Sequence, residues 1–261
     1  MKNLSLLLVF VGLVFTSSAL AQDLSVYEKQ TFFNRKGEMP YRIMMPKFYN
    51  PEIKYPLLIF LHGSGERGND NEAQLTHGAS LFASDSIRDK FPAVVVFPQC
   101  PTEGYWVNSD YQVTDEGVQI TFPRSITARK EQSLLEGLIK ELIKTHAIDE
   151  DRIYIGGLSM GAMGTFELVR RNPKLFAAAF AICGGANPAI AGKLDRLPWW
   201  IFHGEDDQVV PLLYSEQMVE SMRRIDIDVQ FTTYPGVGHD SWTPAFEEPE
   251  LLHWLFEQSK D

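Results

Sequence analysis

The sequence predicts an α/β fold of three layers, in which a mixed, mostly parallel eight-stranded sheet is covered by helices on both faces. Apolar runs of strand length alternate with helical patterns along most of the chain. The first two runs are separated only by a turn that contains Gly37, which indicates an antiparallel hairpin at one edge. The later runs are apolar throughout, as is typical of parallel strands that are buried on both faces.

The expected strands are short, and each is bounded by turn residues or by a helical pattern. They cover residues 26–34, 41–45, 56–61, 93–97, 152–156, 177–182, 199–202 and 229–234. Four helices are expected, at residues 128–146, 161–171, 212–224 and 249–258. The first helix shows a leucine and isoleucine stripe on one face, and Asn172-Pro173 ends the second.

Composition and charge narrow the range of partners. The chain has 261 residues, with 24 Lys and Arg against 34 Asp and Glu, and a formal net charge of −10. It contains no block of basic residues, so the sequence predicts no binding to nucleic acid or to an anionic membrane surface. A small or neutral partner is expected instead.

The first 21 residues have the pattern of a signal peptide rather than of a folded element. Lys2 provides a positive start, residues 4–15 form an apolar core, and Ala19-Leu20-Ala21 is a cleavage signal. The apolar core is shorter than the about 20 residues that a membrane span needs. We therefore expect a mature chain that begins at Gln22 and is secreted or periplasmic, with no membrane attachment after cleavage.

Residues 22–261 are expected to form one domain, with an aromatic insert at residues 101–125. The insert carries Tyr105, Trp106, Tyr111 and Phe122 among polar residues. Connections longer than about 12 to 15 residues are usually functional or disordered, and the aromatic residues favour an ordered segment. The two cysteines, Cys100 and Cys183, follow strands that the proposed fold places about three strand spacings apart. That separation is beyond disulfide reach, so two free, buried thiols are expected.

The strongest local motif is Gly157-Leu158-Ser159-Met160-Gly161, which stands directly between an expected strand and an expected helix. At such a turn the serine adopts a strained backbone, and the glycines remove side chains that would collide with neighbouring backbone. The serine hydroxyl is then held clear of the sheet as a nucleophile. The alternative is a glycine-rich turn in which the serine only caps the helix.

A serine nucleophile needs a base and an acid that orients the base. For this architecture the chain order is serine, then Asp or Glu, then histidine. The strand at 199–202 leads into a loop with Glu205, Asp206 and Asp207, and the last strand leads into a loop with His239. Both loops follow the carboxyl ends of strands, where open α/β sheets place their sites, so these groups can converge on Ser159.

The motifs together resemble the alpha/beta-hydrolase superfamily, and the resemblance covers nearly the whole mature chain. His203-Gly204-x-x-Asp207-x-x-Val210-Pro211 looks like the acid loop of that superfamily and selects Asp207, and residues 61–68 resemble its oxyanion loop. With residues 98–101 and 238–242, the motifs are similar to secreted dienelactone-hydrolase-like and polyhydroxybutyrate-depolymerase-like carboxylesterases, sometimes labelled predicted peptidases. That group is near the carbohydrate acetyl and feruloyl esterases.

This resemblance implies a catalytic triad of Ser159, Asp207 and His239. His239 would act as general base toward Ser159, and Asp207 would fix the tautomer of the imidazole. The oxyanion needs preorganised donors, and the backbone N–H groups of Ser64 and Met160 are the best placed.

Other residues near these motifs are ambiguous. Trp106 either forms a wall of the substrate pocket or packs to hold its own segment, and Trp242 either contacts substrate beside the base or anchors the core. Glu66 and Arg67 either touch the substrate or pair with each other in solvent. The remaining histidines have plainer interpretations. Two that precede a glycine, His62 and His203, are expected to shape loops. The other three are expected at the surface or in the core, and these are His77, His146 and His253.

One competing motif is excluded. Residues 63–68 match the G-x-G-x-x-G fingerprint of dinucleotide-binding folds, but they follow the third expected strand and continue as a loop where a helix should begin. No P-loop, no H-E-x-x-H and no Cys or His pair at metal spacing is present, so no cofactor or metal is expected.

The sequence therefore predicts a secreted serine esterase that acts through an acyl-enzyme on a small-molecule or polysaccharide-derived ester. Acetyl and feruloyl esters of plant polysaccharides are the preferred substrates, because the aromatic insert can stack on a sugar or a phenolic ring. The alternatives are a serine peptidase of the same fold and a non-catalytic glycan-binding homologue. The sequence does not predict the oligomeric state.

Overall fold

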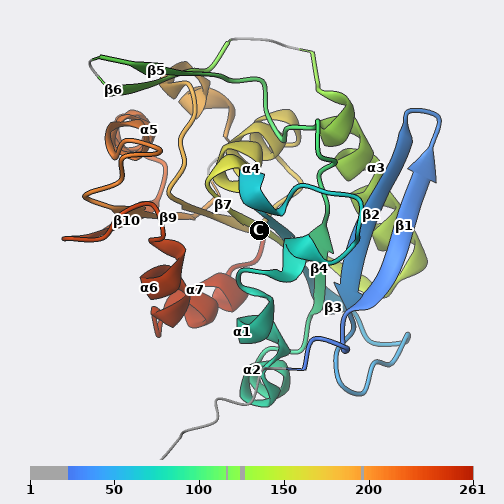
Figure 1. Cartoon of the computed structure of the whole chain (residues 1–261). Coiled ribbons are helices and arrows are strands. Elements are labelled where there is room, and N and C mark those ends of the chain that lie inside the picture. The colour runs from blue at the N-terminus through green and yellow to red at the C-terminus, as the bar shows by residue number, and fades with distance from the viewer. Residues whose placement is uncertain (1–22, 116, 124–126, 195–196, 261) are drawn as a thin grey trace, which may run out of the picture.

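The computed structural model describes residues 23–115, 117–123, 127–194 and 197–260. Its main feature is an eight-stranded sheet with the strand order β1-β2-β4-β3-β7-β8-β9-β10 (Figure 1). The predicted signal peptide at residues 1–21 and the predicted start at Gln22 lie outside the described residues. Within the described part of the chain, no helix has the length and apolar character needed to cross a membrane.

One edge of the sheet is antiparallel and the rest is parallel. β1 (Glu28–Asn34) and β2 (Gly37–Met44) form a hairpin, and β2 also pairs antiparallel with β4 (Val94–Pro98). Parallel pairs then run from β4 through the other strands of the sheet, which are β3 (Tyr55–Leu61), β7 (Ile148–Leu158), β8 (Ala178–Ile182), β9 (Trp199–Gly204) and β10 (Val229–Tyr234). The prediction of a mixed, mostly parallel eight-stranded sheet is confirmed.

Two strands begin four residues earlier than predicted. β2 begins at Gly37 rather than at Tyr41, because the turn is tight enough for Asn34 to pair directly with Gly37. Gly37 has a φ of 137°, a backbone conformation that side-chain-bearing residues rarely adopt. β7 begins at Ile148 rather than at Arg152, since the three residues after Ile148 are acidic and lack the apolar pattern by which buried strands are recognised.

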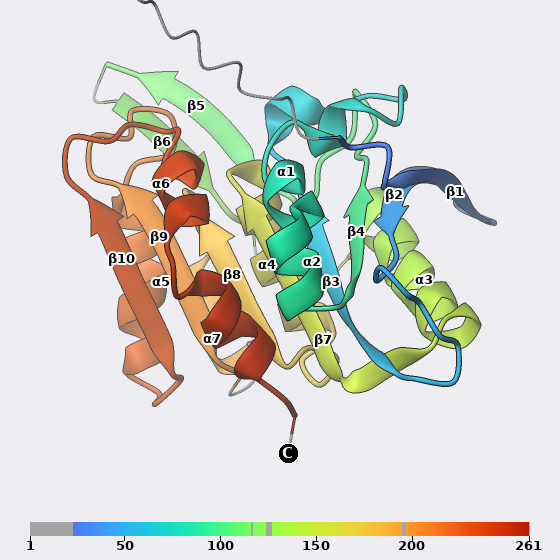
Figure 2. The same cartoon turned by 90° about the horizontal axis from the view of Figure 1, so that it is seen from below.

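Helices cover both faces of the sheet (Figure 2). One face packs against the three longest helices, α3 (Lys130–Thr145), α4 (Met160–Arg171) and α5 (Leu213–Arg223). The other face packs mainly against three shorter ones, α1 (Ala79–Ala83), α6 (Trp242–Glu247) and α7 (Leu251–Glu257), and α2 (Asp85–Lys90) lies on the same side. The four predicted helices are present, whereas α1, α2 and α6 are too short to show a helical period in the sequence.

The aromatic insert forms its own small sheet. β5 (Asp110–Thr114) and β6 (Gly117–Thr121) make an antiparallel hairpin that the sequence did not predict. The hairpin is fixed to the body, because the N–H of Ile120 donates to the hydroxyl of Tyr214 at 2.6 Å. Ile120 is buried together with Met163 of α4 and Val210 of the loop after β9. The insert therefore lies beside the loops that carry the site.

Among the described residues there are also three 3-10 helices, η1 (Ser64–Glu66), η2 (Ala73–Leu75) and η3 (Pro188–Lys193). Both cysteines are free and buried, as predicted. Burial raises the pKa of the Cys100 and Cys183 thiols, which keeps both protonated and unreactive at neutral pH.

Candidate active site

The predicted nucleophile occupies a strained turn. Ser159 stands between β7 and α4 with φ 52° and ψ −119°, and its N–H donates to the carbonyl oxygen of Ile182 at 2.8 Å. A Cβ atom on Gly161 would lie 1.9 Å from the carbonyl oxygen of Leu61, and one on Gly157 would lie 2.5 Å from the carbonyl group of Gly161. Only glycine fits at either position, so the motif holds the strained serine by close backbone contact.

Ser159, His239 and Asp207 form one chain of hydrogen bonds. The Oγ atom of Ser159 lies 2.9 Å from Nε2 of His239, and Nδ1 of His239 lies 2.7 Å from Oδ2 of Asp207. The three residues come from the loops after β7, β10 and β9, at the carboxyl ends of parallel strands. The structure thus brings together the three residues that the sequence places far apart.

Asp207 is held in its ionised form. Its Oδ1 atom accepts hydrogen bonds from the N–H groups of Val209 at 2.8 Å and Val210 at 2.9 Å. Burial alone would raise the pKa of this carboxyl group, but hydrogen bonds from His203, His239 and Val210 hold it well below its usual range. A carboxylate at this place makes Nδ1 of His239 the donor, so that Nε2 is free to accept the proton of Ser159.

The neighbouring acidic residues of the same loop face elsewhere. Glu205 and Asp206 are both exposed, and the carboxylate of Glu205 accepts a hydrogen bond from Thr233 at 2.7 Å. Asp207 is therefore the acid of this loop that contacts His239.

Two backbone N–H groups are candidates for an oxyanion hole. Ser64 is the first residue of η1 and Met160 is the first residue of α4, so neither N–H has a partner within its own helix. A Cβ atom on Gly63 would lie 3.6 Å from the Cβ atom of Ser159, which shows that this loop passes directly against the nucleophile. Both predicted donors therefore belong to segments that border Ser159.

His62 supports the loop that carries Ser64. Its Nδ1 atom donates to the carbonyl oxygen of Gly63 at 2.6 Å, and its Nε2 atom accepts the N–H of Cys100 at 2.9 Å. Burial lowers the pKa of His62 to about 4, so the ring is neutral. The hydrogen bond to Gly63 orients the peptide group whose N–H belongs to Ser64.

Trp106 is a buried anchor rather than a pocket wall. Its side chain is fully buried, its indole N–H donates to the carbonyl oxygen of His62 at 3.1 Å, and its Cβ atom would lie 2.4 Å from a Cβ on Gly164. Of the two interpretations of Trp106, these contacts favour the one in which it holds its own segment. The next residue, Val107, lines a cavity in its place.

The other predicted contact residues have partners among themselves and in the neighbouring loops. The ring of Trp242 lies 5.5 Å from that of His239 and 4.9 Å from that of His77. Glu66 lies 3.6 Å from Nε2 of His77, and Arg67 donates to Ser64 O and lies over the ring of Tyr105 at 4.6 Å. Glu66 and Arg67 therefore have separate partners, which corrects the alternative in which they pair with each other.

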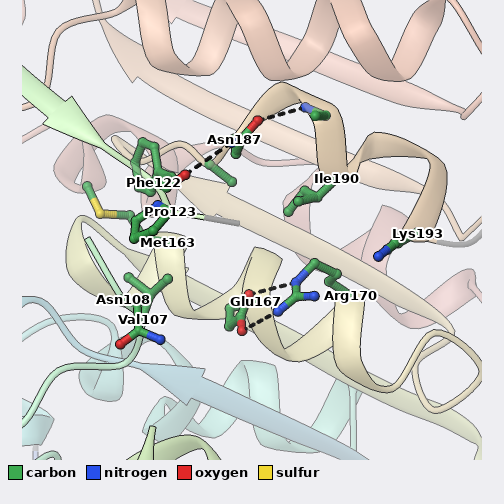
Figure 3. A pocket seen from close by; sticks show the side chains of 12 residues that line it. Val107, Asn108, Phe122, Pro123, Met163, Glu167, Arg170, Asn187, Ile190 and Lys193 are labelled. Carbon is green, nitrogen blue, oxygen red and sulfur yellow. Dashed lines mark hydrogen bonds and ion pairs between the residues drawn. The ribbon is translucent and has the colours of Figure 1, made fainter. Parts of the chain in front are cut away.

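A cavity of about 290 Å³ is lined by residues of the insert, of α4 and of η3 (Figure 3). Met163, whose N–H donates to Ser159 O at 3.1 Å, lies in its wall. The apolar lining includes Val107, Phe122 and Ile190, and a bidentate Glu167–Arg170 pair and Lys193 lie at one end. The cavity thus has an aromatic and aliphatic wall and a polar end.

Sequence reasoning did not identify His77 or the cavity residues Val107 and Met163. His77 has no motif, and its position beside Trp242 depends on the close approach of Gly78 to Phe246 of α6. Met163 follows Ser159 by four residues, which places it one helical turn below the nucleophile, and this spacing was the only available signal.

A metal is not needed to explain the acidic and sulfur groups here. In the part of the chain that the structure describes, ligand atoms of Cys183, Asp207 and His239 lie within 4.8 Å of one another. Asp207 and His239 are already hydrogen-bonded to each other, and burial raises the pKa of the Cys183 thiol, which disfavours the thiolate that a metal prefers.

Comparisons with known proteins agree with this arrangement. Residues 50–249 match the family described as Phospholipase/Carboxylesterase. Acyl-protein thioesterase 1 of Debaryomyces hansenii is 28% identical over 194 residues, covering 70% of this chain and 84% of that protein. A bifunctional acetylxylan esterase/xylanase of Neocallimastix patriciarum is 28% identical over 170 residues, covering 64% of this chain and 22% of that protein.

Among solved structures, a thermostable esterase superposes with a TM-score of 0.82 and 36% sequence identity over 91% of this chain. The chain spans 64% of the length of that esterase. The fold and the site together define an α/β-hydrolase. The chain belongs to the Phospholipase/Carboxylesterase family and is a carboxylic ester hydrolase.

Proposed function

We propose that this enzyme is a serine esterase that hydrolyses hydroxycinnamoyl or acetyl esters of polysaccharides through Ser159, His239 and Asp207. The observation that supports it most is the pair of hydrogen bonds that joins Ser159 to His239 at 2.9 Å and His239 to Asp207 at 2.7 Å. Within this range of hydrogen-bond geometry, a proton passes directly from hydroxyl to imidazole.

The reaction follows from this geometry. His239 Nε2 takes the hydroxyl proton of Ser159 as Oγ attacks the ester carbonyl, and the N–H groups of Ser64 and Met160 donate to the oxyanion. The C–O bond to the alcohol then breaks, and the alcohol leaves with the proton from His239. Water attacks the acyl-enzyme by the same proton route, and the carboxylic acid is released from Ser159.

The cavity favours an aromatic acyl group. Pockets for small ligands typically start at about 300 Å³ and combine apolar walls with a few polar groups. The cavity beside Met163 has a comparable volume of about 290 Å³, and its wall includes the ring of Phe122. A hydroxycinnamoyl ring would fill this space with its phenolic end near Lys193, whereas an acetyl group would leave it largely empty. We therefore place hydroxycinnamoyl esters ahead of acetyl esters.

The compartment is part of the proposal. A signal peptide at residues 1–21 would deliver the enzyme to the periplasm or the medium, where polymer-derived esters are met. Secretion of the full-length chain with cleavage before Gln22, read by N-terminal sequencing, is the expected result. An uncleaved chain in the cytosol would contradict it.

Thioester cleavage is the second candidate function, because a relative named acyl-protein thioesterase 1 aligns over 84% of its own length. The same triad attacks thioesters and amides as well as oxygen esters. The substrates should therefore be compared in parallel: a feruloylated oligosaccharide, acetylated xylan, an acyl thioester and an aminoacyl p-nitroanilide. We expect the highest kcat/KM on the feruloylated substrate; a preference for the thioester or the anilide would make the enzyme a thioesterase or a peptidase.

The serine mechanism is tested by Ser159→Ala with Ser259→Ala as a control. Ser259 is exposed near the end of the chain, so its variant should match the wild type. Ser159→Ala should lose activity by about 10⁴-fold or more and should no longer be labelled by a fluorophosphonate. Retained turnover in Ser159→Ala would contradict the mechanism, and absence of turnover and labelling in the wild type would favour a non-catalytic homologue.

A further inference from the structure

Two histidines precede a glycine at the end of a strand, and their surroundings differ. His62 has one acceptor, the carbonyl oxygen of Gly63 at 2.6 Å, and one donor, the N–H of Cys100 at 2.9 Å. One protonated and one bare ring nitrogen satisfy both contacts, so His62 is a neutral imidazole.

His203, in β9, is fully buried and is surrounded by acceptors. Its Nε2 atom lies 2.8 Å from the carbonyl oxygen of Val210 and 3.2 Å from Oδ2 of Asp207. Neither oxygen can donate, so Nε2 must carry a proton. The protonation of the ring then depends on the partner of Nδ1.

Nδ1 of His203 also faces an acceptor. It lies 2.7 Å from Oγ of Ser215, and that hydroxyl lies 2.6 Å from the carbonyl oxygen of Gly184. Ser215 has one proton, and the short distance to the carbonyl places it there, since two oxygen atoms at 2.6 Å without a proton between them repel each other. Ser215 therefore accepts from Nδ1, and Nδ1 carries a proton too.

We propose that His203 is an imidazolium that forms a buried ion pair with Asp207, and that it is a positioning residue which acts on His239 through Asp207. An isolated buried charge is strongly unfavourable, whereas a paired and hydrogen-bonded one is tolerated. The pair supplies both conditions, because Asp207 also accepts from Val209, Val210 and His239. In its kinetic part this inference rests on the proposed function.

The groups that face His203 come from several elements of the fold. Asp207 faces it from the loop after β9, Ser215 from α5, and Cys183 and Gly184 follow β8, while His239 and Asp240 belong to the loop after β10. Glu205 and Asp206 are exposed on the loop of Asp207, and burial keeps the Cys183 thiol neutral by raising its pKa. Asp207 is thus the acidic group in direct contact with the ring.

The positive charge of His203 partly offsets the negative charge of Asp207. A carboxylate stabilises the protonated form of a neighbouring imidazole, so a fully uncompensated Asp207 would favour protonated His239, which cannot act as a base. With His203 charged, Asp207 favours protonated His239 less strongly, so His239 can act as a base down to a lower pH. Loss of this charge should move the midpoint of the acid limb of the kcat/KM–pH profile to a pH about one unit higher.

The protonation state can be read directly by nitrogen-15 NMR of the full chain labelled at histidine, with His203→Gln used for assignment. At pH 7 both ring nitrogens of His203 should give protonated shifts. His62 is the internal control and should give one protonated and one bare nitrogen. A bare nitrogen on His203 would overturn the proposal, and this result does not depend on any enzymatic activity.

The kinetic test compares the pH profile of His203→Gln with that of the wild type and of His146→Gln. Gln keeps a neutral donor near the place of Nε2, so it removes the charge while retaining a hydrogen bond to Asp207. His146 lies at the end of α3, remote from these contacts, and its variant should keep the wild-type profile. We expect the acid limb of His203→Gln to rise by about one pH unit.

A uniform loss of rate with an unchanged acid limb would indicate a structural role only and would overturn the proposal. Ser215→Ala gives a second variant in case His203→Gln does not fold. It removes the acceptor of Nδ1, so its acid limb should move in the same direction. If Ser159→Ala proved active instead, the proposed function would fail while the NMR result for His203 would stand.

Discussion

Gly161 lies directly against the carbonyl oxygen of Leu61, so the nucleophile turn and the strand that leads to Ser64 are in backbone contact. A Cβ atom at Gly161 would be 1.9 Å from that oxygen and 2.7 Å from the carbonyl oxygen of His62. The distance between Ser159 and the loop that carries Ser64 is therefore set by two backbones, which cannot move aside as side chains do.

Gly161→Ala should accordingly destabilise the protein by about 3 kcal/mol, at the upper end of the usual range for overpacking. Urea unfolding measures the change. Gly192→Ala is the matched control, because a Cβ at Gly192 meets no atom within 4 Å. Equal stability of the two variants would contradict the contact at Leu61.

Asp207→Asn should lower kcat by about 10⁴-fold, because an amide that donates to Nδ1 of His239 stabilises the wrong imidazole tautomer. Steady-state kinetics on a p-nitrophenyl ester measures it. Asp206→Asn, one residue earlier and exposed, should keep wild-type activity. A large loss in Asp206→Asn with an active Asp207→Asn would reassign the acid.

The depressed pKa of Asp207 links stability to pH. Below the pKa of Asp in the unfolded chain, about 3.9, the unfolded state binds this proton while the folded state resists it. The contribution of Asp207 is therefore present above that value and is lost as the pH falls toward the folded pKa. The stability of the wild type relative to Asp207→Asn, from urea unfolding at several pH values, should shrink below about pH 4. A constant difference would show that Asp207 is not stabilised as a carboxylate.

Phe122→Ala should reduce kcat/KM on a feruloylated substrate by roughly tenfold relative to an acetyl ester, since the cavity loses an aromatic wall. The ratio of the two rates corrects for any general loss of activity. Tyr111→Ala, in β5 of the same insert but 51% exposed, should leave the ratio unchanged. If the ratio for Phe122→Ala also stayed unchanged, the cavity would not hold the acyl group.

Much of the fold and the position of Ser159 were predictable, because their signals are local. Buried parallel strands are continuous apolar runs, and the glycines around Ser159 record a steric need of the turn itself. The choice of Asp207 over Glu205 and Asp206 required a resemblance to known hydrolases, since all three acidic residues are consecutive in the loop after β9. The hydrogen bonds of Asp207 to Val209 and Val210 supply the physical reason for that choice.

Other features depend on contacts that a sequence pattern does not contain. β5 consists of exposed residues, and the hairpin is held through Ile120 and Tyr214, which are 94 positions apart. Trp106 stands in a polar segment and is nevertheless fully buried, because Gly164 of α4 leaves room for it. The surroundings of His203 are equally non-local, since Ser215 and Gly184 come from other elements.

The insert and the catalytic loops are separate stretches of chain. Val107 and Phe122 of the insert shape the cavity, whereas Ser64, Ser159, Asp207 and His239 belong to loops at the ends of β3, β7, β9 and β10. Mutations in the insert can therefore reshape the cavity while the hydrogen bonds among Ser159, His239 and Asp207 are preserved. An architecture of this kind allows the cavity to diverge among related hydrolases while the residues of the hydrogen-bonded chain stay the same.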